Sequence, residues 1–187
     1  MMRLAAAVLA LGVLAGCANS GTGVVPPKTV DRVDLARYQG TWYEQARLPM
    51  FFQRDCAQSE AHYSLQDDGS IGVLNRCRTL EGEWQQAEGR AVPQVEGKTD
   101  KLWVTFDNWF SNLLPGVAKG DYWVLYLDDD YRTALVGSPN RKFLWLLTRE
   151  QQVSAAQRDK LLEVARSQGY DTQELIWRSP NAAIRTP

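Results

Sequence analysis

The segment Gly40-Thr41-Trp42-Tyr43-Glu44 constrains the fold of this chain more than any other stretch. In an extended strand alternate side chains share one face, so Trp42, Glu44 and Ala46 would stand in a row. A large aromatic ring, an acid and a small side chain in one row suit the wall of a barrel lumen better than a solid core. The alternative, in which Trp42 is an ordinary core aromatic of an antiparallel sheet, stays open on this segment alone.

Alternation of apolar and polar side chains predicts seven more strands after this first one, with a long loop at residues 107–120. The strands are expected at residues 57–66, 71–77, 83–92, 101–106, 122–127, 133–137 and 142–149. Ser154-Ala155-Ala156-Gln157 has the form of a capping box, which predicts a helix that ends near Gly169. A short last strand follows at 175–178. The expected fold is all-β: an eight-stranded antiparallel up-and-down β-barrel with one C-terminal α-helix and a short final strand.

The amino terminus reads as a processing segment. Arg3 and an apolar run from Leu4 to Leu14 precede Leu14-Ala15-Gly16-Cys17, which resembles the bacterial lipobox. The run is shorter than the roughly 20 residues that a spanning helix needs. We expect Cys17 to be the lipid attachment site, carrying a diacylglyceryl group. The alternative is an ordinary secretory peptide that leaves Cys17 free.

This processing segment and a change in composition set the expected domain boundaries. Residues 1–16 are a lipoprotein signal peptide, and 17–33, rich in Gly and Pro, are a lipidated flexible tether. Residues 34–179 form the barrel domain, and 180–187 form a disordered tail. Ala18 follows the lipidated cysteine instead of the Asp that is familiar as an inner-membrane retention signal. The resemblance therefore favours anchoring in the bacterial outer membrane, on its periplasmic face.

The two remaining cysteines are expected to bond to each other. Cys56 and Cys77 form an even pair in an oxidising compartment, and they flank a predicted hairpin turn at 67–70. The only histidine, His62, lies on the outward phase of a predicted strand without a second ligand at zinc spacing. We therefore expect a Cys56–Cys77 disulfide and no metal site.

Composition limits the function classes. The 187 residues suffice for one domain, and a formal net charge of -1 provides no positive field to collect nucleic acid. Seven Trp and seven Tyr exceed what a compact core of this size needs. Because aromatic side chains often line apolar ligand sites, a cavity is expected.

Three motifs in order make the chain resemble a lipocalin over about Val33 to Arg178. They are Gly40-Thr41-Trp42-Tyr43-Glu44, the turn Asp129-Asp130-Tyr131 in place of Thr-Asp-Tyr, and Arg149 at the end of the eighth strand. Within that family the chain is similar to the bacterial outer-membrane lipoprotein branch and to apolipoprotein D. The resemblance implies a barrel floor built from Gly40, Trp42 and Arg149, in which the arginine stacks over the indole of Trp42.

The resemblance also implies a lumen that holds one small ligand. The inward face expected from alternation is mainly apolar with a few polar groups, as a site for an acyl chain with a polar head would be. The predicted ligand-binding residues are Glu44, Ala46, Ala61, Tyr63, Val73, Asn75, Ala87, Gly89, Val104, Phe106, Tyr122, Val124, Leu135 and Trp145.

The leading interpretation is a carrier without enzymatic activity and without a cofactor. It would bind, store or transport lipids such as fatty acids or lysophospholipids in the lumen, for membrane maintenance, while its lipid anchor holds it at the membrane. One alternative is a lipocalin-fold enzyme acting on a lipid-like substrate, although no nucleophile with a base is found. Another is a ligand-free structural lipoprotein, against which the small Ala87 and Gly89 speak. The resemblance allows a homodimer.

Overall fold

The computed structural model describes residues 25–106 and 119–185. The predicted signal peptide, the predicted lipid attachment site Cys17 and nearly all of the predicted loop at 107–120 lie outside these residues. Among the described residues, no helix combines the length and the apolar character needed to cross a bilayer.

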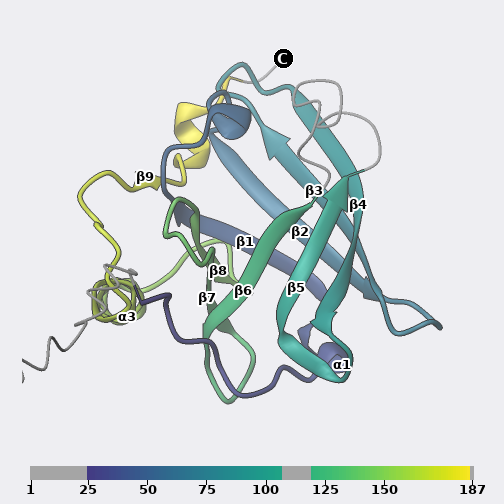
Figure 1. Ribbon diagram of the computed structural model, residues 1–187. Coiled ribbons are helices and arrows are strands. Elements are labelled where there is room, and N and C mark those ends of the chain that lie inside the picture. The colour runs from purple at the N-terminus through teal and green to yellow at the C-terminus, as the bar shows by residue number, and fades with distance from the viewer. Residues whose placement is uncertain (1–24, 107–118, 186–187) are drawn as a thin grey trace, which may run out of the picture.

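Eight strands close into an antiparallel barrel, as the sequence predicts (Figure 1). Each strand pairs with the next, and β1 pairs with both β2 and β8, which closes the ring. A short strand, β9, pairs with the C-terminal end of β1, at Ala46 and Arg47. One long helix, α3, follows β8. The bounds are β1 Gly40–Arg47, β2 Gln58–Leu65, β3 Ile71–Arg78, β4 Trp84–Val95, β5 Lys98–Phe106, β6 Gly120–Leu127, β7 Thr133–Gly137, β8 Leu144–Thr148, α3 Ala155–Ser167 and β9 Ile176–Trp177.

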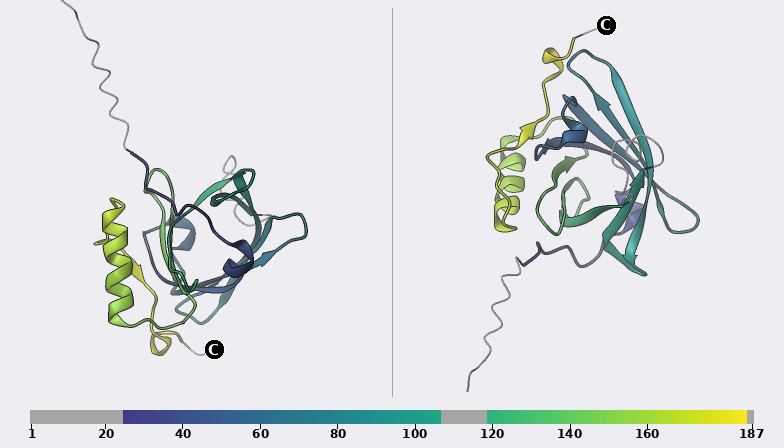
Figure 2. Two further views of the ribbon diagram at one scale, coloured as in Figure 1. Left: turned by 90° about the horizontal axis from the view of Figure 1, so that it is seen from below. Right: turned by 45° about the horizontal axis from the view of Figure 1, so that its top comes forward.

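A short helix, α1 (Leu35–Tyr38), lies across one end of the ring, and α3 packs on its outside (Figure 2, left). Asp34 begins α1 by accepting hydrogen bonds from the backbone N–H groups of Ala36 and Arg37. The sequence did not predict α1, because four residues are too few to show helical periodicity. The helix α3 begins with the predicted capping box, in which Ser154 and Gln157 bond reciprocally.

A bulge in β1 corrects the predicted face of two residues. Glu44 pairs with Leu147, but Ala46 pairs with Leu146, so one extra residue is inserted at Gln45. Beyond this bulge the faces exchange. Ala46 lies on the outer face, in the apolar layer under α3, and Arg47 takes the inward position. The prediction that Ala46 faces the lumen was therefore wrong.

Leu135 also lies on the outer face, contrary to the prediction. Its neighbours in β7, Ala134 and Val136, belong to the cluster inside the barrel. Leu135 instead pairs with Leu146 and packs in the layer under α3. Two apolar cores result, one inside the closed half of the barrel and one between the barrel wall and α3.

Both ends of the domain are more ordered than the expected boundaries indicate. Val33, assigned to the tether, is buried in the barrel core, and the Val30 N–H donates to the carbonyl of Val124. At the other end a 3₁₀ turn, η2 (Asn181–Ala183), is followed by the buried Ile184. The described part of the tail up to residue 185 thus differs from the disordered tail expected at 180–187.

The predicted disulfide between Cys56 and Cys77 is confirmed, with an S–S distance of 1.95 Å. It joins the segment before β2 to the end of β3. The two cysteines are 21 residues apart in the chain. On the chain-entropy model a cross-link over a loop of this size stabilises the fold by about 3 kcal/mol.

Candidate functional site

The barrel encloses a cavity of about 790 Å³ that opens at the end opposite α1. Most of the residues predicted to bind a ligand do line it. These are Glu44, Ala61, Tyr63, Val73, Asn75, Ala87, Val104, Phe106, Tyr122 and Trp145. The lining is mostly apolar, and two groups of polar side chains in it are described below.

Four of the predicted ligand-binding residues do not line the cavity. Ala46 and Leu135 lie under α3, as described above. Val124 is buried in the apolar cluster of the closed half. Gly89 is packed against β5 in the barrel wall. A side chain at this position would meet the backbone oxygen of Thr105 and the ring of Phe106. Phe106 thus fills the space that the small residue leaves.

The closed end is built around Trp42, whose side chain is fully buried. The guanidinium carbon of Arg149 lies 3.9 Å from the centre of the Trp42 ring, as the family resemblance implies. Arg149 also donates to the backbone carbonyls of Thr41, at 2.9 Å, and Arg37, at 3.0 Å. Gly40 has φ of +93°, a conformation that favours glycine, and Arg149 Nη1 lies 3.3 Å from where the Cβ of a side chain would be.

Three tyrosine hydroxyls meet above this floor. Tyr38 comes from α1, Tyr63 from β2 and Tyr122 from β6. The Tyr38 and Tyr122 hydroxyl oxygens lie 2.8 Å apart, and Tyr122 donates to Tyr63 at 3.1 Å. Burial raises the pKa of Tyr63 to about 12 and raises the pKa values of Tyr38 and Tyr122 as well. All three hydroxyls therefore keep their protons at neutral pH. Alternation predicted Tyr63 and Tyr122, but missed Tyr38 because α1 was not predicted.

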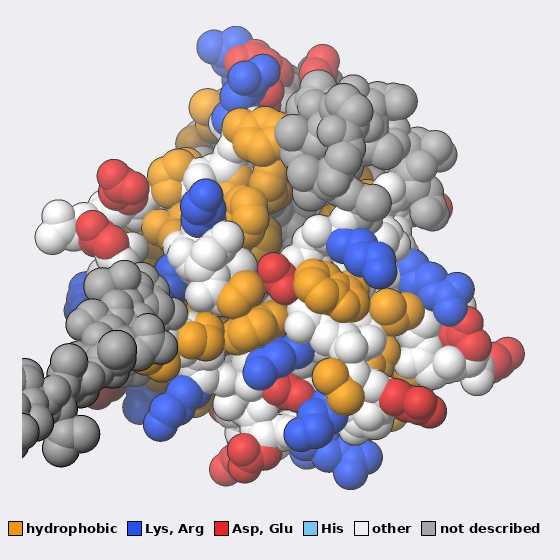
Figure 3. All heavy atoms as spheres, in the orientation of Figure 1, with side chains coloured by type: hydrophobic (Ala, Val, Ile, Leu, Met, Phe, Trp, Pro, Cys, Tyr) orange, Lys and Arg blue, Asp and Glu red, His pale blue; other side chains and the backbone are white. Residues whose placement is uncertain are grey.

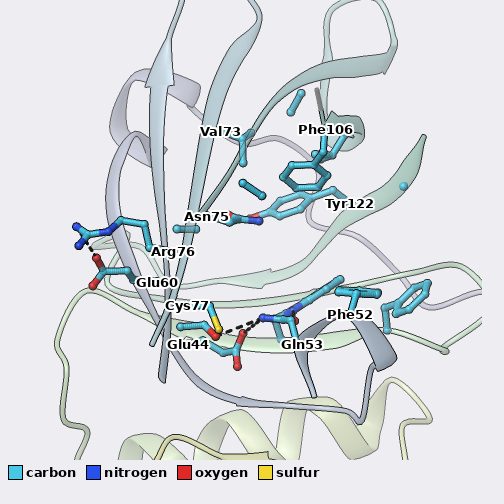
Figure 4. Close-up of a pocket in the computed structure, with 18 of the residues that line it drawn as sticks. Glu44, Phe52, Gln53, Glu60, Val73, Asn75, Arg76, Cys77, Phe106 and Tyr122 are labelled. Carbon is cyan, nitrogen blue, oxygen red and sulfur yellow. Dashed lines mark hydrogen bonds and ion pairs between the residues drawn. The ribbon is translucent and has the colours of Figure 1, made fainter. Parts of the chain in front are cut away.

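A second polar group occupies the wall on the β1 side. Arg47 donates to Glu44 at 2.8 Å, and both side chains are buried. Arg47 also donates to the carbonyls of Gln53 and Cys56, at 2.6 and 3.0 Å, while the Gln53 side chain donates to Glu44 at 2.9 Å. Figure 4 shows Glu44 and Gln53 side by side, apart from Phe106 and Tyr122. The sequence reasoning missed Arg47 because nothing in the pattern marks the bulge that turns it inward.

The open end carries an aromatic rim. The 3₁₀ turn η1 (Phe51–Gln53) follows β1, and Phe52 lies 5.8 Å from Phe143, ring centre to ring centre. Trp145 donates from its indole to the Gln53 side chain at 3.0 Å, which ties the turn to β8. In the space-filling view, hydrophobic side chains gather in the upper part of the face, on the side of the C-terminal segment (Figure 3). The apolar turn η1 thus forms part of the rim of the cavity.

The described residues contain no cluster of metal ligands, and their single histidine lies outside the cavity. In the described ranges no group of three or more His, Cys, Asp or Glu side chains is arranged to hold a metal ion. His62 is exposed, and its ring nitrogen lies 3.1 Å from the hydroxyl of Thr41 on the outer face. The cavity can therefore enclose an apolar molecule and offer hydrogen bonds at its base and on its β1 wall.

Comparison with known proteins assigns a family. Residues 33–180 match the family model described as a lipocalin-like domain. The outer membrane lipoprotein Blc of Citrobacter freundii is 36% identical over 187 residues, covering 97% of this chain and 99% of the relative. Blc of Vibrio cholerae is 39% identical over 179 residues, covering 94% and 98%. Insecticyanin from the tobacco hornworm shares the fold, with a TM-score of 0.63 at 20% identity over 87% of this chain and 88% of that chain.

Proposed function

The chain belongs to the lipocalin family, and from that membership we propose that it is a membrane-anchored carrier of single lipid molecules. The barrel lumen takes fatty acids or lysophospholipids, and the protein stores them or moves them for membrane maintenance. The observation that carries this proposal is the cavity of about 790 Å³ with its mostly apolar lining. Ligand sites for small molecules typically measure about 300–1,000 Å³.

The arrangement of the lumen supports a lipid with a polar head. Apolar side chains from many strands face one another around the cavity, so an acyl chain would leave water for an apolar surface. Lys142 lines the cavity near its open end, where it would meet an anionic head group. The side chain of Arg76 points away from the lumen and is paired with Glu60 at 3.2 Å (Figure 4).

An enzyme on this scaffold has less support. Lipocalin-like proteins are binding proteins, and the described cavity lining contains no histidine. Cys56 and Cys77 are joined in the disulfide, so neither is a free thiol nucleophile. A ligand-free structural barrel has less support too, because the described side chains leave the cavity unfilled.

Ligand binding is tested by filling the lumen. Ala87 lines the cavity, whereas its neighbour Glu88 is exposed on the outer face. Ala87→Phe is expected to weaken binding of a fluorescent fatty acid by about tenfold or more, which corresponds to about 1.4 kcal/mol. Glu88→Phe is the matched control and should leave the affinity unchanged.

Titration with the fluorescent fatty acid, together with a thermal melt of each variant, provides the measurement. The Ala87 variant should keep its melting temperature, because the ring enters space that the ligand vacates. If the unaltered protein binds neither a fatty acid nor a lysophospholipid, and Ala87→Phe destabilises it, the barrel is a filled structural domain and the carrier function is refuted.

Anchoring is the second part of the proposal. The relatives named outer membrane lipoprotein and the lipobox-like Leu14-Ala15-Gly16-Cys17 support a lipid on Cys17 and a place on the periplasmic face of the outer membrane. Stable anchoring requires more than one acyl chain, since a single chain binds only marginally. Cys17→Ser is expected to move the protein from the membrane pellet to the soluble periplasmic fraction. Continued sedimentation of this variant with outer membranes would argue against lipid attachment at Cys17.

A further inference from the structure

We propose that the tyrosine trio, defined as Tyr38, Tyr63 and Tyr122, is a binding subsite for an uncharged oxygen atom at the leading end of the ligand. This inference rests on the proposed function. It narrows the ligand class to long apolar molecules that carry a hydroxyl, ketone or ester oxygen at the end that enters the barrel first.

Counting protons provides the first argument. Three hydroxyl groups bring three donors, but only two hydrogen bonds join them, Tyr38 with Tyr122 and Tyr122 with Tyr63. One donor is therefore unused in any arrangement of the protons. Because Tyr122 donates to Tyr63, Tyr38 must donate to Tyr122, and the unused proton belongs to Tyr63. Within the described residues this proton has no acceptor.

The position of the trio provides the second argument. All three tyrosines line the cavity, and Tyr38 and Tyr63 are buried. Tyr38 lies on α1, which covers the closed end, and Tyr63 pairs with Gly40, the first residue of β1. The unused donor therefore faces the deep end of the lumen. A chain of hydroxyls that donate in one direction strengthens the last donor, because each bond polarises the next.

A methyl group at this place would leave the donor unpaired. Burying a polar group without a partner costs free energy, whereas an oxygen acceptor at the same place makes the missing hydrogen bond. A plain acyl tail that reaches the base would displace any water from the trio without replacing its bond. The geometry thus favours a ligand with an oxygen at its inner end over one that ends in a methyl group.

The charges around the trio favour an uncharged oxygen over a carboxylate. Arg149, beside Trp42, directs its donors to the backbone carbonyls of Thr41, Arg37 and Tyr131. Arg47 is paired with Glu44 on the β1 wall. Both cations are already engaged, Arg149 with backbone carbonyls and Arg47 with Glu44, and neither is hydrogen-bonded to a hydroxyl of the trio. A carboxylate there would lose its water without gaining an unengaged counter-ion.

The test compares two acids that differ only at the far end of the chain, hexadecanoic acid and 16-hydroxyhexadecanoic acid, each in competition with a fluorescent fatty acid. The unaltered protein is expected to bind the hydroxy acid at least as tightly as the plain acid, although burial of a hydroxyl in an apolar site ordinarily weakens binding. Tyr63→Phe should weaken binding of the hydroxy acid by about tenfold, the loss of one buried hydrogen bond, and should leave the plain acid unchanged or tighter.

Two further variants keep the test decisive. Tyr122→Phe removes the hydroxyl that donates to Tyr63 and polarises it, so it should weaken binding of the hydroxy acid selectively but by less than Tyr63→Phe, and it serves as the test should Tyr63→Phe not fold. Tyr170→Phe is the matched control, because its hydroxyl is bound to Ser138 outside the cavity. It should not change the ratio of the two affinities.

Three results would refute the proposed subsite. An equal loss for both acids in Tyr63→Phe would mean that the carboxyl end enters first or that the ring only shapes the lumen. A hydroxy acid that binds more weakly than the plain acid by the same factor in all variants would mean that the trio binds no oxygen. If neither acid binds the unaltered protein, the carrier function itself fails, and the subsite fails with it.

Discussion

Replacing Arg47 with methionine is expected to lower the free energy of unfolding by about 3–5 kcal/mol, because the change leaves the buried carboxylate of Glu44 without its counter-ion. The side chains of the two residues are 2% and 7% exposed, so water can replace little of the lost interaction. The carbonyls of Gln53 and Cys56 also lose their donor. Chemical denaturation of Arg47→Met and of the unaltered protein measures the difference in the free energy of unfolding.

Two controls separate this effect from a general loss of charge. Arg54→Met removes an arginine from an exposed pair with Asp55, and it should change stability by less than about 0.5 kcal/mol. The double variant Glu44→Leu with Arg47→Met should recover much of the loss, since a buried ion pair can be replaced by apolar residues at little cost. A single Arg47 variant as stable as the unaltered protein would contradict the burial described for this pair.

Replacing Trp42 with alanine is the other change of large expected effect, again about 3–5 kcal/mol. The fully buried indole fills the floor, donates to the Tyr38 carbonyl at 2.8 Å and supports the guanidinium of Arg149. Its removal leaves a cavity beside α1 and takes away a cation–π contact worth about 0.5–2 kcal/mol. The measurement is a denaturant titration followed by circular dichroism.

Trp84→Ala is the matched control for this change. Trp84 is 48% exposed at the start of β4, where its ring contacts Arg76, so its removal should cost much less. Comparable losses in the two tryptophan variants would show that the floor does not hold the barrel together in the way described.

The order of the strands, the C-terminal helix and the disulfide could be predicted from the sequence. Two-residue alternation is a local signal, and it identified the eight strands and the faces of residues such as Val73 and Asn75. The helix α3 was predictable because its capping box lies in the sequence. The pairing of Cys56 with Cys77 followed from elimination and from the hairpin between them.

The remaining features depend on contacts that no local pattern records. A bulge such as the one at Gln45 is stabilised by the strands on either side, and it exchanges every face that follows it. Arg47 was therefore expected outside the lumen, and Ala46 inside. The buried Ile184 and Val33 were likewise missed, because their partners lie far away in the chain.

The first strand of the barrel is the one that meets the last. β1 pairs with β2, β8 and β9, and Gln45 bonds to Thr148 across a sequence separation of 103 residues. Contacts of such long range slow folding, because a large loop must close before they form. Until β8 has been made, β1 presents an unpaired edge that can join other chains. Closure therefore waits for nearly the whole polypeptide, and the unpaired edge of β1 stays open to pairing with other chains until β8 is in place.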